Sequence, residues 1–353
     1  MTRPLAIFAA SRLVVLAGMW LGTRLRPELS LADVSSTWDG GWYLLVAEAG
    51  YPAAIPDGQS TLVFFPLYPL LVRLAADLPG VTPIAAGLVV GMAAAAAGAV
   101  ALWFLAREVW DGEVADRVVL LFSFFPGSFV LSMVYADGVM IALAAACLWA
   151  LVTRRWLTAG VLAALATASR PNAVALVAAC AWASAVAIRR DRAWRSLVAP
   201  LLAPAGIGAF FAFLWVRTGE ATAWFQAERA GWDERVTPFA VVDDVRQLVR
   251  DPFVDTNNTV VVVGTIVAVT GLVLLLRTRA PGALVVYGAV VVGLALVSET
   301  LGPRPRFVLT AFPVLCGFAL HLRGTALTTV VALSAGTLGA FTLVSVTTLL
   351  ATP

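Results

Sequence analysis

The chain has 353 residues, of which 61% are hydrophobic and only 13% are charged. Soluble domains carry roughly 25% charged residues, so this chain has too few to coat a soluble fold, and lipid must surround most of its surface. The formal net charge is only +3, and all 24 basic residues are arginine, which gives no reason to expect a nucleic-acid partner.

Eleven apolar stretches are candidates for membrane-spanning helices, each of which needs about 20 apolar residues. They lie near 5–23, 82–106, 117–134, 137–153, 157–169, 172–188, 197–216, 259–276, 282–298, 307–322 and 325–350. The stretch 157–169 is too short to span alone, so it is either a broken helix or one bent unit with its successor around Pro171. The first stretch is a retained helix and not a signal peptide, because Arg12 interrupts it and no A-x-A site follows. The sequence therefore predicts one all-α transmembrane domain over 1–353, a polytopic bundle of about eleven helices.

The placement of arginine predicts the orientation of this bundle. If the N-terminus is cytoplasmic, the inner connections are 107–117, 154–156, 189–196, 277–281 and 323–324. Outside the first of them, they contain nine arginines and only one acid. The opposite connections contain most of the acids, as the positive-inside rule requires. We therefore expect a multi-pass cell-membrane protein with two long extracytoplasmic loops, 24–63 and 217–258. Loops longer than a bundle needs usually carry function.

The first long loop contains the most informative motif, which runs from Trp38 to Pro52. We expect Asp39 to cap a short helix, because its carboxylate can accept hydrogen bonds from free backbone amides. Residues at helical spacing predict one apolar face, made of Trp42, Leu45, Val46 and Ala49. Gly50 is a natural stop, and with Trp38 and Tyr43 at its rim the helix should lie in the membrane interface. A second aromatic run, 64–70, has prolines at 66 and 69 that fit the start of another helix.

These residues resemble the PIG-V family, the integral membrane enzymes similar to GPI mannosyltransferase 2. The first luminal loop of that family has a W-D-x-x-W/Y-Y/F-L-x-I-A-x-x-G-Y pattern and then an F-F-P-L-Y-P-L run. The matching residues here are Trp38, Asp39, Trp42, Tyr43, Leu44, Val46, Ala47, Gly50, Tyr51 and 64–70. The stretches 124–137 and 168–172 are also similar, although Asp137 stands where the family more often has Glu. The similarity is dense over 37–73 and 122–173 and weak beyond 200.

The resemblance implies a GT-C-like fold with its active site on the extracytoplasmic side. It also implies a polyprenyl-phosphate sugar donor, usually a mannose donor. The acceptor is a lipid, a glycan or a protein, and the sequence does not distinguish them. Membrane lipids are the other expected partners.

Sugar transfer from a lipid phosphate needs a carboxylate base and a cation at the departing phosphate. Asp39 is the candidate base of an inverting displacement, and simple helix capping is its alternative role. Arg170, Arg304 and Arg306 are the candidates for the phosphate, because a guanidinium group can bind it with two hydrogen bonds. The alternatives for these arginines are snorkelling, or pairing with Asp137 or Glu299.

Aromatic and acidic side chains of the same regions are the candidates for substrate binding. They are Trp38, Trp42, Tyr43, Tyr68, Tyr135 and Asp137. Asp137 is equally well explained as part of a turn. The segment 224–232 could contact an acceptor through its rings, although an interfacial amphipathic helix is the favoured interpretation.

The cysteines and the histidine give no sign of a metal site. Cys147, Cys180 and Cys316 each lie in an apolar run, and no C-x-x-C motif occurs. His321, beside Arg323, is typical of an interfacial side chain. The sequence has neither an Asp-x-Asp motif nor a cluster of histidines and carboxylates, so we expect no metal and no cofactor.

Two other functions compete with the glycosyltransferase. A transporter or lipid flippase would show paired broken helices in two similar halves, but the helix-breaking prolines at 126, 171, 204 and 313 show no such symmetry. A non-catalytic relative of the family would be revealed if Asp39→Asn left function unchanged.

Overall fold

A computed structural model describes residues 2–233, 237, 240–250, 256–298 and 302–348. Over these residues the chain forms helices and no β-strand, which confirms the predicted all-α fold. The helices are α1 (Thr2–Leu25), α2 (Leu31–Ser35), α3 (Asp39–Ala49), η1 (Thr61–Val63), α4 (Leu67–Ala76), α5 (Pro83–Val109), α6 (Gly112–Phe124), η2 (Pro126–Ser132), α7 (Asp137–Val152), α8 (Trp156–Thr167), η3 (Pro171–Val174), α9 (Ala175–Asp191), η4 (Trp194–Leu197), α10 (Val198–Leu202), α11 (Ala205–Thr218), α12 (Ala223–Trp232), α13 (Ala240–Arg250), α14 (Thr256–Leu276), α15 (Gly282–Leu296), α16 (Pro305–Thr310), α17 (Pro313–His321) and α18 (Gly324–Thr347).

Six helical stretches of the described chain are long and apolar enough to cross a membrane. They are Thr2–Leu25, Pro83–Val109, Pro171–Asp191, Trp194–Thr218, Asn257–Leu276 and Gly324–Thr347. A seventh results if α6 and η2 are taken as one bent span, and α7, α8 and α15 are shorter apolar helices. The chain is therefore a multi-pass membrane protein, while the count of eleven crossings stays a prediction.

Prolines break two of the predicted spans. The stretch expected as one helix over 117–134 is α6 followed by η2, which turns away by 76°. Phe125 has a ψ of 138°, because the ring of Pro126 disfavours a helical conformation at the residue before it. The stretch 307–322 likewise divides into α16 and α17, and Pro313 is the first residue of the second helix. Both breaks lie in segments that position the site.

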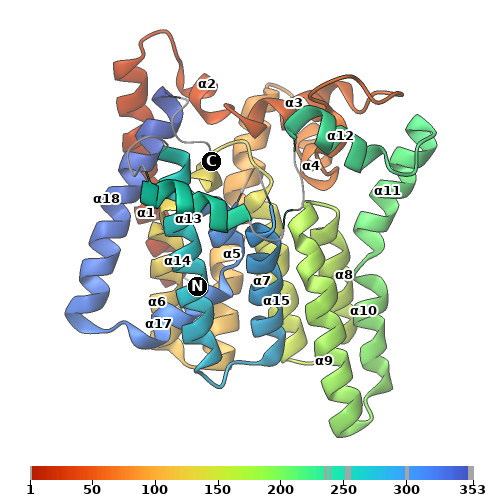
Figure 1. Ribbon diagram of the computed structural model, residues 1–353, viewed down its shortest axis with the longest axis vertical. Coiled ribbons are helices and arrows are strands. Elements are labelled where there is room, and N and C mark those ends of the chain that lie inside the picture. The colour runs from red at the N-terminus through yellow and green to blue at the C-terminus, as the bar shows by residue number, and fades with distance from the viewer. Residues whose placement is uncertain (1, 234–236, 238–239, 251–255, 299–301, 349–353) are drawn as a thin grey trace.

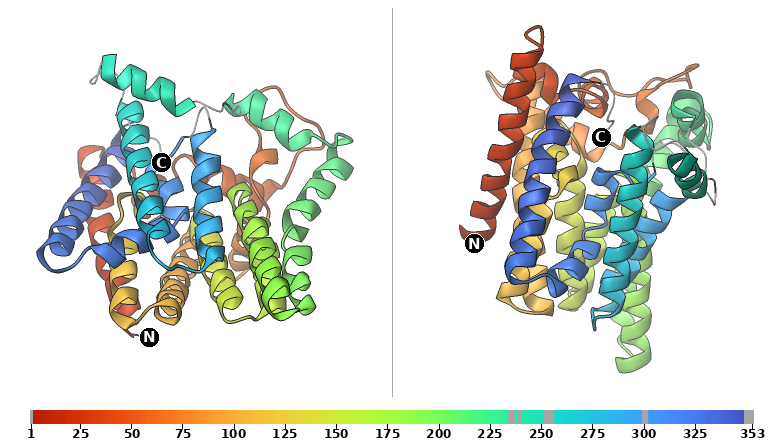
Figure 2. Two further views of the ribbon diagram at one scale, coloured as in Figure 1. Left: turned by 60° about the horizontal axis from the view of Figure 1, so that its bottom comes forward. Right: turned by 60° about the vertical axis from the view of Figure 1, so that its left-hand side comes forward.

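Four short helices gather at one end of the bundle. Figure 1 shows α2, α3, α4 and α12 together there, and Figure 2 shows that the N-terminus lies at the far end of α1. We call the unit made by α3, η1 and α4 the shelf. Its buried side packs into an apolar cluster that includes Tyr43, Leu62, Phe65, Tyr68 and Phe210. The second long loop, expected over 217–258, contains α12 and α13, and its residues 234–236, 238–239 and 251–255 lie outside the described chain.

Helix α3 differs from its prediction in two details. Asp39 is its first residue and not its cap; the N-cap is Trp38, which makes no side-chain capping bond. The buried face is made of Gly40, Tyr43, Val46 and Ala47, whereas Leu45 and Ala49 of the predicted face are exposed. The face is displaced by about one residue because Tyr43 is buried in the aromatic cluster, whereas Trp42 packs against it only partly buried. Gly50 ends the helix as predicted, with a φ of 75°.

Arg12 is buried in α1 and anchors η2. Its guanidinium group donates to the carbonyl oxygens of Ser128 (2.6 Å) and Ser123 (2.9 Å) and to the hydroxyl of Ser132 (3.1 Å). A charge buried in an apolar bundle is tolerated only with such hydrogen bonds. The anchored segment packs directly on α16, because a Cβ atom on Gly127 would lie 2.3 Å from the carbonyl of Pro305. Helix α1 therefore fixes, through η2, the place where α16 begins.

Candidate active site

An ion pair joins the start of α3 to α16. Nη1 of Arg306 lies 2.6 Å from Oδ2 of Asp39, and the two side chains are 6% and 23% exposed. The first turn of a helix favours a carboxylate electrostatically, which suits the position of Asp39. Tyr135 supports both partners: its hydroxyl accepts from the backbone amide of Asp39 (3.3 Å), and its ring lies 5.6 Å from the guanidinium carbon of Arg306.

Trp38 is held in a conformation that side chains rarely adopt. Its φ is 58° and its ψ is −124°. Residues in such sparsely populated regions cost about 1–3 kcal/mol each and persist only when surrounding contacts determine them. The indole of Trp38 donates to the carbonyl of Ser345 in α18 (3.2 Å), which supplies such a contact. The strained residue directly precedes Asp39, so it fixes the direction in which α3 and its first carboxylate enter the site.

A second ion pair lies beside the first. Arg170 donates through Nη1 to Oδ2 of Asp137, the first residue of α7, and both side chains are buried. The guanidinium carbons of Arg306 and Arg170 lie 4.9 Å and 5.9 Å from the ring centre of Phe307. The two arginines therefore meet over one aromatic ring, where cation–π attraction adds to the ion pairs. Two arginines and two aspartates, whose formal charges sum to zero, therefore lie together in a largely buried region.

The arginines keep hydrogen-bonding capacity after these pairs are formed. Nε of Arg170 and Nε of Arg306 are buried without a hydrogen-bond partner among the described residues, and so is Oδ1 of Asn172. A buried polar group without a partner costs about 1–3 kcal/mol. Burial raises the pKa of Tyr43, so its phenol stays neutral and keeps a proton to donate. The two Nε atoms and the Tyr43 phenol can donate to an oxygen-rich anionic ligand, whereas Oδ1 of Asn172 and the buried Oδ1 of Asp137, also without a partner among the described residues, need a donor.

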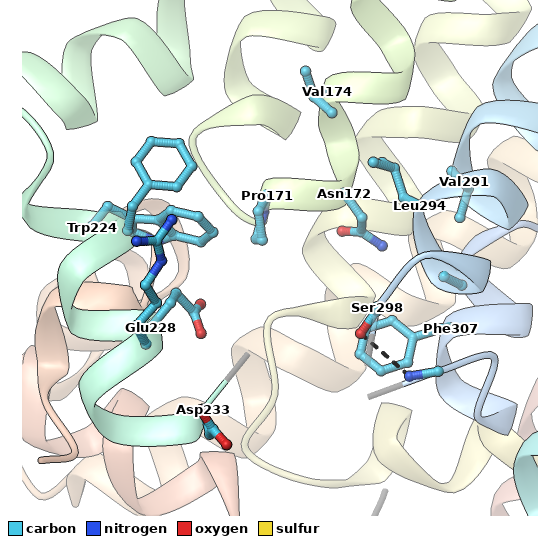
Figure 3. A pocket seen from close by; sticks show the side chains of 14 residues that line it. Pro171, Asn172, Val174, Trp224, Glu228, Asp233, Val291, Leu294, Ser298 and Phe307 are labelled. Carbon is cyan, nitrogen blue, oxygen red and sulfur yellow. Dashed lines mark hydrogen bonds between the residues drawn. The ribbon is translucent and has the colours of Figure 1, made fainter. Parts of the chain in front are cut away.

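Three of the four charged groups, Asp39, Arg170 and Arg306, line a small chamber of about 120 Å³ at the shelf end of the bundle. Its lining consists of Asp39, Tyr43, Val63, Phe64, Phe65, Ser169, Arg170, Pro171, Asn172, Glu228, Trp232, Arg306 and Phe307. A larger, mainly apolar cavity of about 840 Å³ adjoins it and shares Pro171, Asn172, Glu228 and Phe307 with it. Figure 3 shows Trp224 and Glu228 of α12 on one side of this cavity and Asn172 and Phe307 on the other. A polar end and a long apolar extension are therefore continuous.

Four of the predicted site residues lie together in this chamber: Asp39, Tyr43, Arg170 and Arg306. Asp137 is fully buried behind Arg170 and does not line the chamber. Arg304, the N-cap of α16, is not part of the lining either. Glu299, one expected partner of the arginines, lies outside the described residues.

The remaining predicted aromatic residues form a layer around the chamber. Trp42 packs against Phe64 at 5.9 Å and against Trp232 at 5.7 Å, and both of these residues line the chamber. The buried hydroxyl of Tyr68 donates to the carbonyl of Gly87 (2.8 Å), which ties α4 to α5. Together with Trp38 and Tyr135, described above, these rings support the chamber from behind.

Sequence reasoning did not single out four of the lining residues: Asn172, Glu228, Trp232 and Phe307. Asn172 carried a signal, because it ends the 168–172 stretch that also contains Arg170. Glu228 and Trp232 belong to the segment for which an interfacial helix was the favoured interpretation. That segment is α12, which the indole of Trp224 ties to the carbonyl of Val63 in the shelf (3.2 Å). Nothing in the sequence distinguishes Phe307 from the other apolar residues of its helix.

Comparison with protein-family models and with curated proteins gives no match. Solved structures do share the fold. ArnT from Cupriavidus metallidurans bound to undecaprenyl phosphate is 14% identical, with a TM-score of 0.56 over 90% of this chain and 60% of that one. The Archaeoglobus fulgidus oligosaccharyltransferase in its apo form is also 14% identical, with a TM-score of 0.53 over 97% of this chain and 56% of that one.

The chain thus spans 60% and 56% of the length of these two proteins. At such low identity the likeness establishes the fold and no more. The expected all-α membrane bundle is confirmed, with a fold similar to that of these two proteins, and membership of the PIG-V family and of the GT-C superfamily stays a prediction.

Proposed function

We propose that this protein is a membrane glycosyltransferase that takes a sugar from a polyprenyl-phosphate carrier. The observation that carries the proposal is the chamber of Asp39, Arg170 and Arg306, which opens into an apolar cavity of about 840 Å³. A lipid-linked sugar has the same two parts, a phosphate with its sugar and a long apolar chain. The similar fold of ArnT, which was solved with undecaprenyl phosphate, supports this choice of donor.

In this proposal the two chamber arginines bind the donor phosphate. Each already gives Nη1 to a carboxylate, and each has a buried Nε without a partner among the described residues. A phosphate oxygen would satisfy these donors through charge-assisted hydrogen bonds, which are roughly twice as strong as neutral ones. Arg304 stays a candidate at the edge of the apolar cavity, whose lining includes the nearby Gly302. The polyprenyl chain would occupy the cavity between α12 and α15.

Asp39 is proposed as the general base. Arg306 binds its Oδ2, which leaves Oδ1 to take the proton of the acceptor hydroxyl. The acceptor oxygen then forms a bond to the anomeric carbon of the sugar, and the bond from that carbon to the phosphate oxygen breaks. The electron pair leaves with the lipid phosphate, whose added negative charge the arginines stabilise. One displacement of this kind inverts the anomeric centre.

The proposals for the side of the membrane on which the chamber lies and for the identity of the transferred sugar are based on the sequence. Arg189 and Arg190 lie in the last turn of α9, and Figure 1 shows the α9–α10 turn at the end of the bundle opposite the shelf. The positive-inside rule then supports an extracytoplasmic chamber and a cytoplasmic N-terminus. Mannose is proposed from the resemblance of the first loop to the PIG-V family. A transporter has less support, because the two buried ion pairs, Asp39–Arg306 and Asp137–Arg170, lie side by side at the shelf end of the bundle.

Two measurements on the purified full-length protein test the proposal. The first is binding of polyprenyl phosphate, which we expect Arg170→Gln and Arg306→Gln each to weaken by about tenfold or more. Arg24→Gln is the matched control, because Arg24 is exposed and packs only over Trp20. The second is release of polyprenyl phosphate from polyprenyl-phosphate mannose in the presence of lipid, glycan and protein fractions of the cell envelope. If the protein neither bound polyprenyl phosphate nor released it from polyprenyl-phosphate mannose, the proposed glycosyltransferase function would be refuted.

A further inference from the structure

A second cavity of about 590 Å³ lies on the other side of the shelf, between α3, α4 and α11. We call it the α11 groove. Its lining is apolar apart from backbone groups, the Tyr51 side chain and two arginines, Arg73 and Arg217. Neither Asp39 nor Arg170 nor Arg306 belongs to its described lining. The groove is therefore separate from the chamber described above.

The groove follows one face of α11 from its start to its end. Gly206, Ala209, Phe210, Phe213 and Arg217 line it at helical spacing. At about 1.5 Å per residue, this face is roughly 16 Å long. The two smallest side chains stand near the start of α11, and the arginine stands in its last turn. The groove thus has a charged end beside the shelf and an apolar end deeper in the bundle, which is the shape of a lipid with an anionic head group.

The two arginines are suited to a phosphate. Nε and Nη2 of Arg217 both donate to the carbonyl of Tyr51, at 3.2 Å and 3.1 Å, so the side chain is fixed and Nη1 points elsewhere. Arg73 is exposed and forms no ion pair with the described residues. No carboxylate belongs to the described lining of the groove. Two cations that line one apolar groove, with no carboxylate in its described lining, complement the charge of a phosphate group.

A wall separates this groove from the reacting groups. Phe65 lines the chamber, and its ring packs 4.7 Å from the ring of Phe210, which lines the groove. Next to it, the backbone amide of Leu67 donates to the carbonyl of Ala168 (3.0 Å). A molecule in the groove would meet this wall before it reached Asp39. The occupant is therefore neither the sugar donor nor the reacting acceptor.

We propose that the α11 groove binds an anionic glycerophospholipid of the surrounding membrane. Its phosphate lies between Arg73 and Arg217, and one acyl chain runs along α11 towards Gly206. The lipid also supports the shelf, because Val46 and Ala47 in the second half of α3 line the groove. Under the glycosyltransferase function proposed above, this contact would help to hold the helix whose first residue is the base.

Native mass spectrometry of the detergent-purified full chain with added phosphatidylglycerol or phosphatidylcholine tests the proposal. We expect the protein to retain one phosphatidylglycerol in preference to phosphatidylcholine. The double variant R73Q/R217Q should lower its retention by about tenfold or more, whereas Arg24→Gln should leave it unchanged. Ala209→Phe, a change at an exposed position, should fill the groove and reduce retention of both lipids. Equal retention of the two lipids by the natural protein, or undiminished retention of phosphatidylglycerol by the double variant, would overturn the proposal.

A competition experiment separates this site from the donor site. Saturating polyprenyl phosphate should leave the bound phosphatidylglycerol in place, and R73Q/R217Q should still bind polyprenyl phosphate. Displacement of one lipid by the other would show a single shared site and refute the α11 groove. Neither of these measurements depends on catalytic turnover. The proposal for the α11 groove can therefore be refuted while the proposed enzyme activity is supported, and the enzyme activity can be refuted while the groove proposal is supported.

Discussion

Asp39→Asn tests the proposed base most directly. The substitution keeps the shape of the side chain and removes its charge and its ability to take a proton. A positioned general base contributes about 10²–10⁴ in rate, which corresponds to about 2.7–5.5 kcal/mol in the activation free energy. Asp39 lines the chamber but only its Oδ2 is engaged, so the missing proton acceptor should lower kcat by a factor in that range. The donor KM should change little.

The partner substitution Arg306→Gln distinguishes a base from a structural anchor. Removing this guanidinium group leaves the carboxylate of Asp39, which is 23% exposed and therefore partly solvated. Donor binding should weaken, because one phosphate contact is lost, while proton transfer remains possible. If Asp39 served only to hold Arg306, then D39N, R306Q and the double variant would share one phenotype. We expect instead that D39N affects kcat more than R306Q does.

The assay is release of polyprenyl phosphate from a labelled polyprenyl-phosphate sugar by the purified protein. Asp33→Asn is the matched control, because Asp33 is an acid in the first turn of the neighbouring α2 and forms its capping box with Ser30. Its activity should equal that of the natural protein. The reasoning is refuted if D39N keeps kcat within about threefold, less than 1 kcal/mol, while its unfolding midpoint is unchanged.

Three further outcomes follow from the packing around the chamber. Arg12→Met should lower stability by about 1–3 kcal/mol, because the carbonyls of Ser123 in α6 and Ser128 in η2 lose their buried donor. An unchanged unfolding midpoint in detergent would contradict this role. Gly127→Ala should weaken binding of polyprenyl phosphate, because its Cβ would lie 2.3 Å from backbone atoms of α16, whereas Gly208→Ala, which meets no atom within 4 Å, should bind normally. Burial raises the pKa of Tyr43 and of Tyr135 above that of an unfolded tyrosine, about 10, so the unfolded state loses these protons first. Unfolding midpoints should therefore be insensitive to these groups below about pH 10 and fall above it, with a smaller fall in Tyr43→Phe.

Much of the fold could be predicted because lipid imposes simple requirements. Apolar stretches must be helical when water cannot satisfy their backbone groups, and each predicted stretch overlaps an observed helix. The predicted helix boundaries are wrong where tertiary contacts decide which backbone conformation a segment adopts. Phe125 leaves the helix before Pro126, and Arg12 in another helix holds the bend by binding the carbonyls of Ser123 before it and Ser128 after it. No local pattern over 117–134 contains that information.

The site could be predicted one residue at a time but not as pairs. Arg170 and Arg306 stood out because charges are rare and costly in an apolar chain, and Asp39 stood out through its motif. Asp39 and Arg306 are 267 positions apart, and only packing shows that they meet. The same distance explains why Asp39 was expected to cap its own helix. Its carboxylate had a free backbone amide within local reach, but the buried arginine of α16 is the stronger partner.

The pairing itself has a consequence for how a phosphate could enter. A lone arginine in a region this buried would be destabilising, so the structure holds each one beside a carboxylate. Each carboxylate takes only Nη1 of its arginine and leaves Nε without a partner among the described residues. Both Nε atoms are buried, so a phosphate that binds them must first shift the side chains that cover them. Because Asp39 engages only Nη1 of Arg306, it would remain beside the bound donor, where a base for the acceptor hydroxyl is needed.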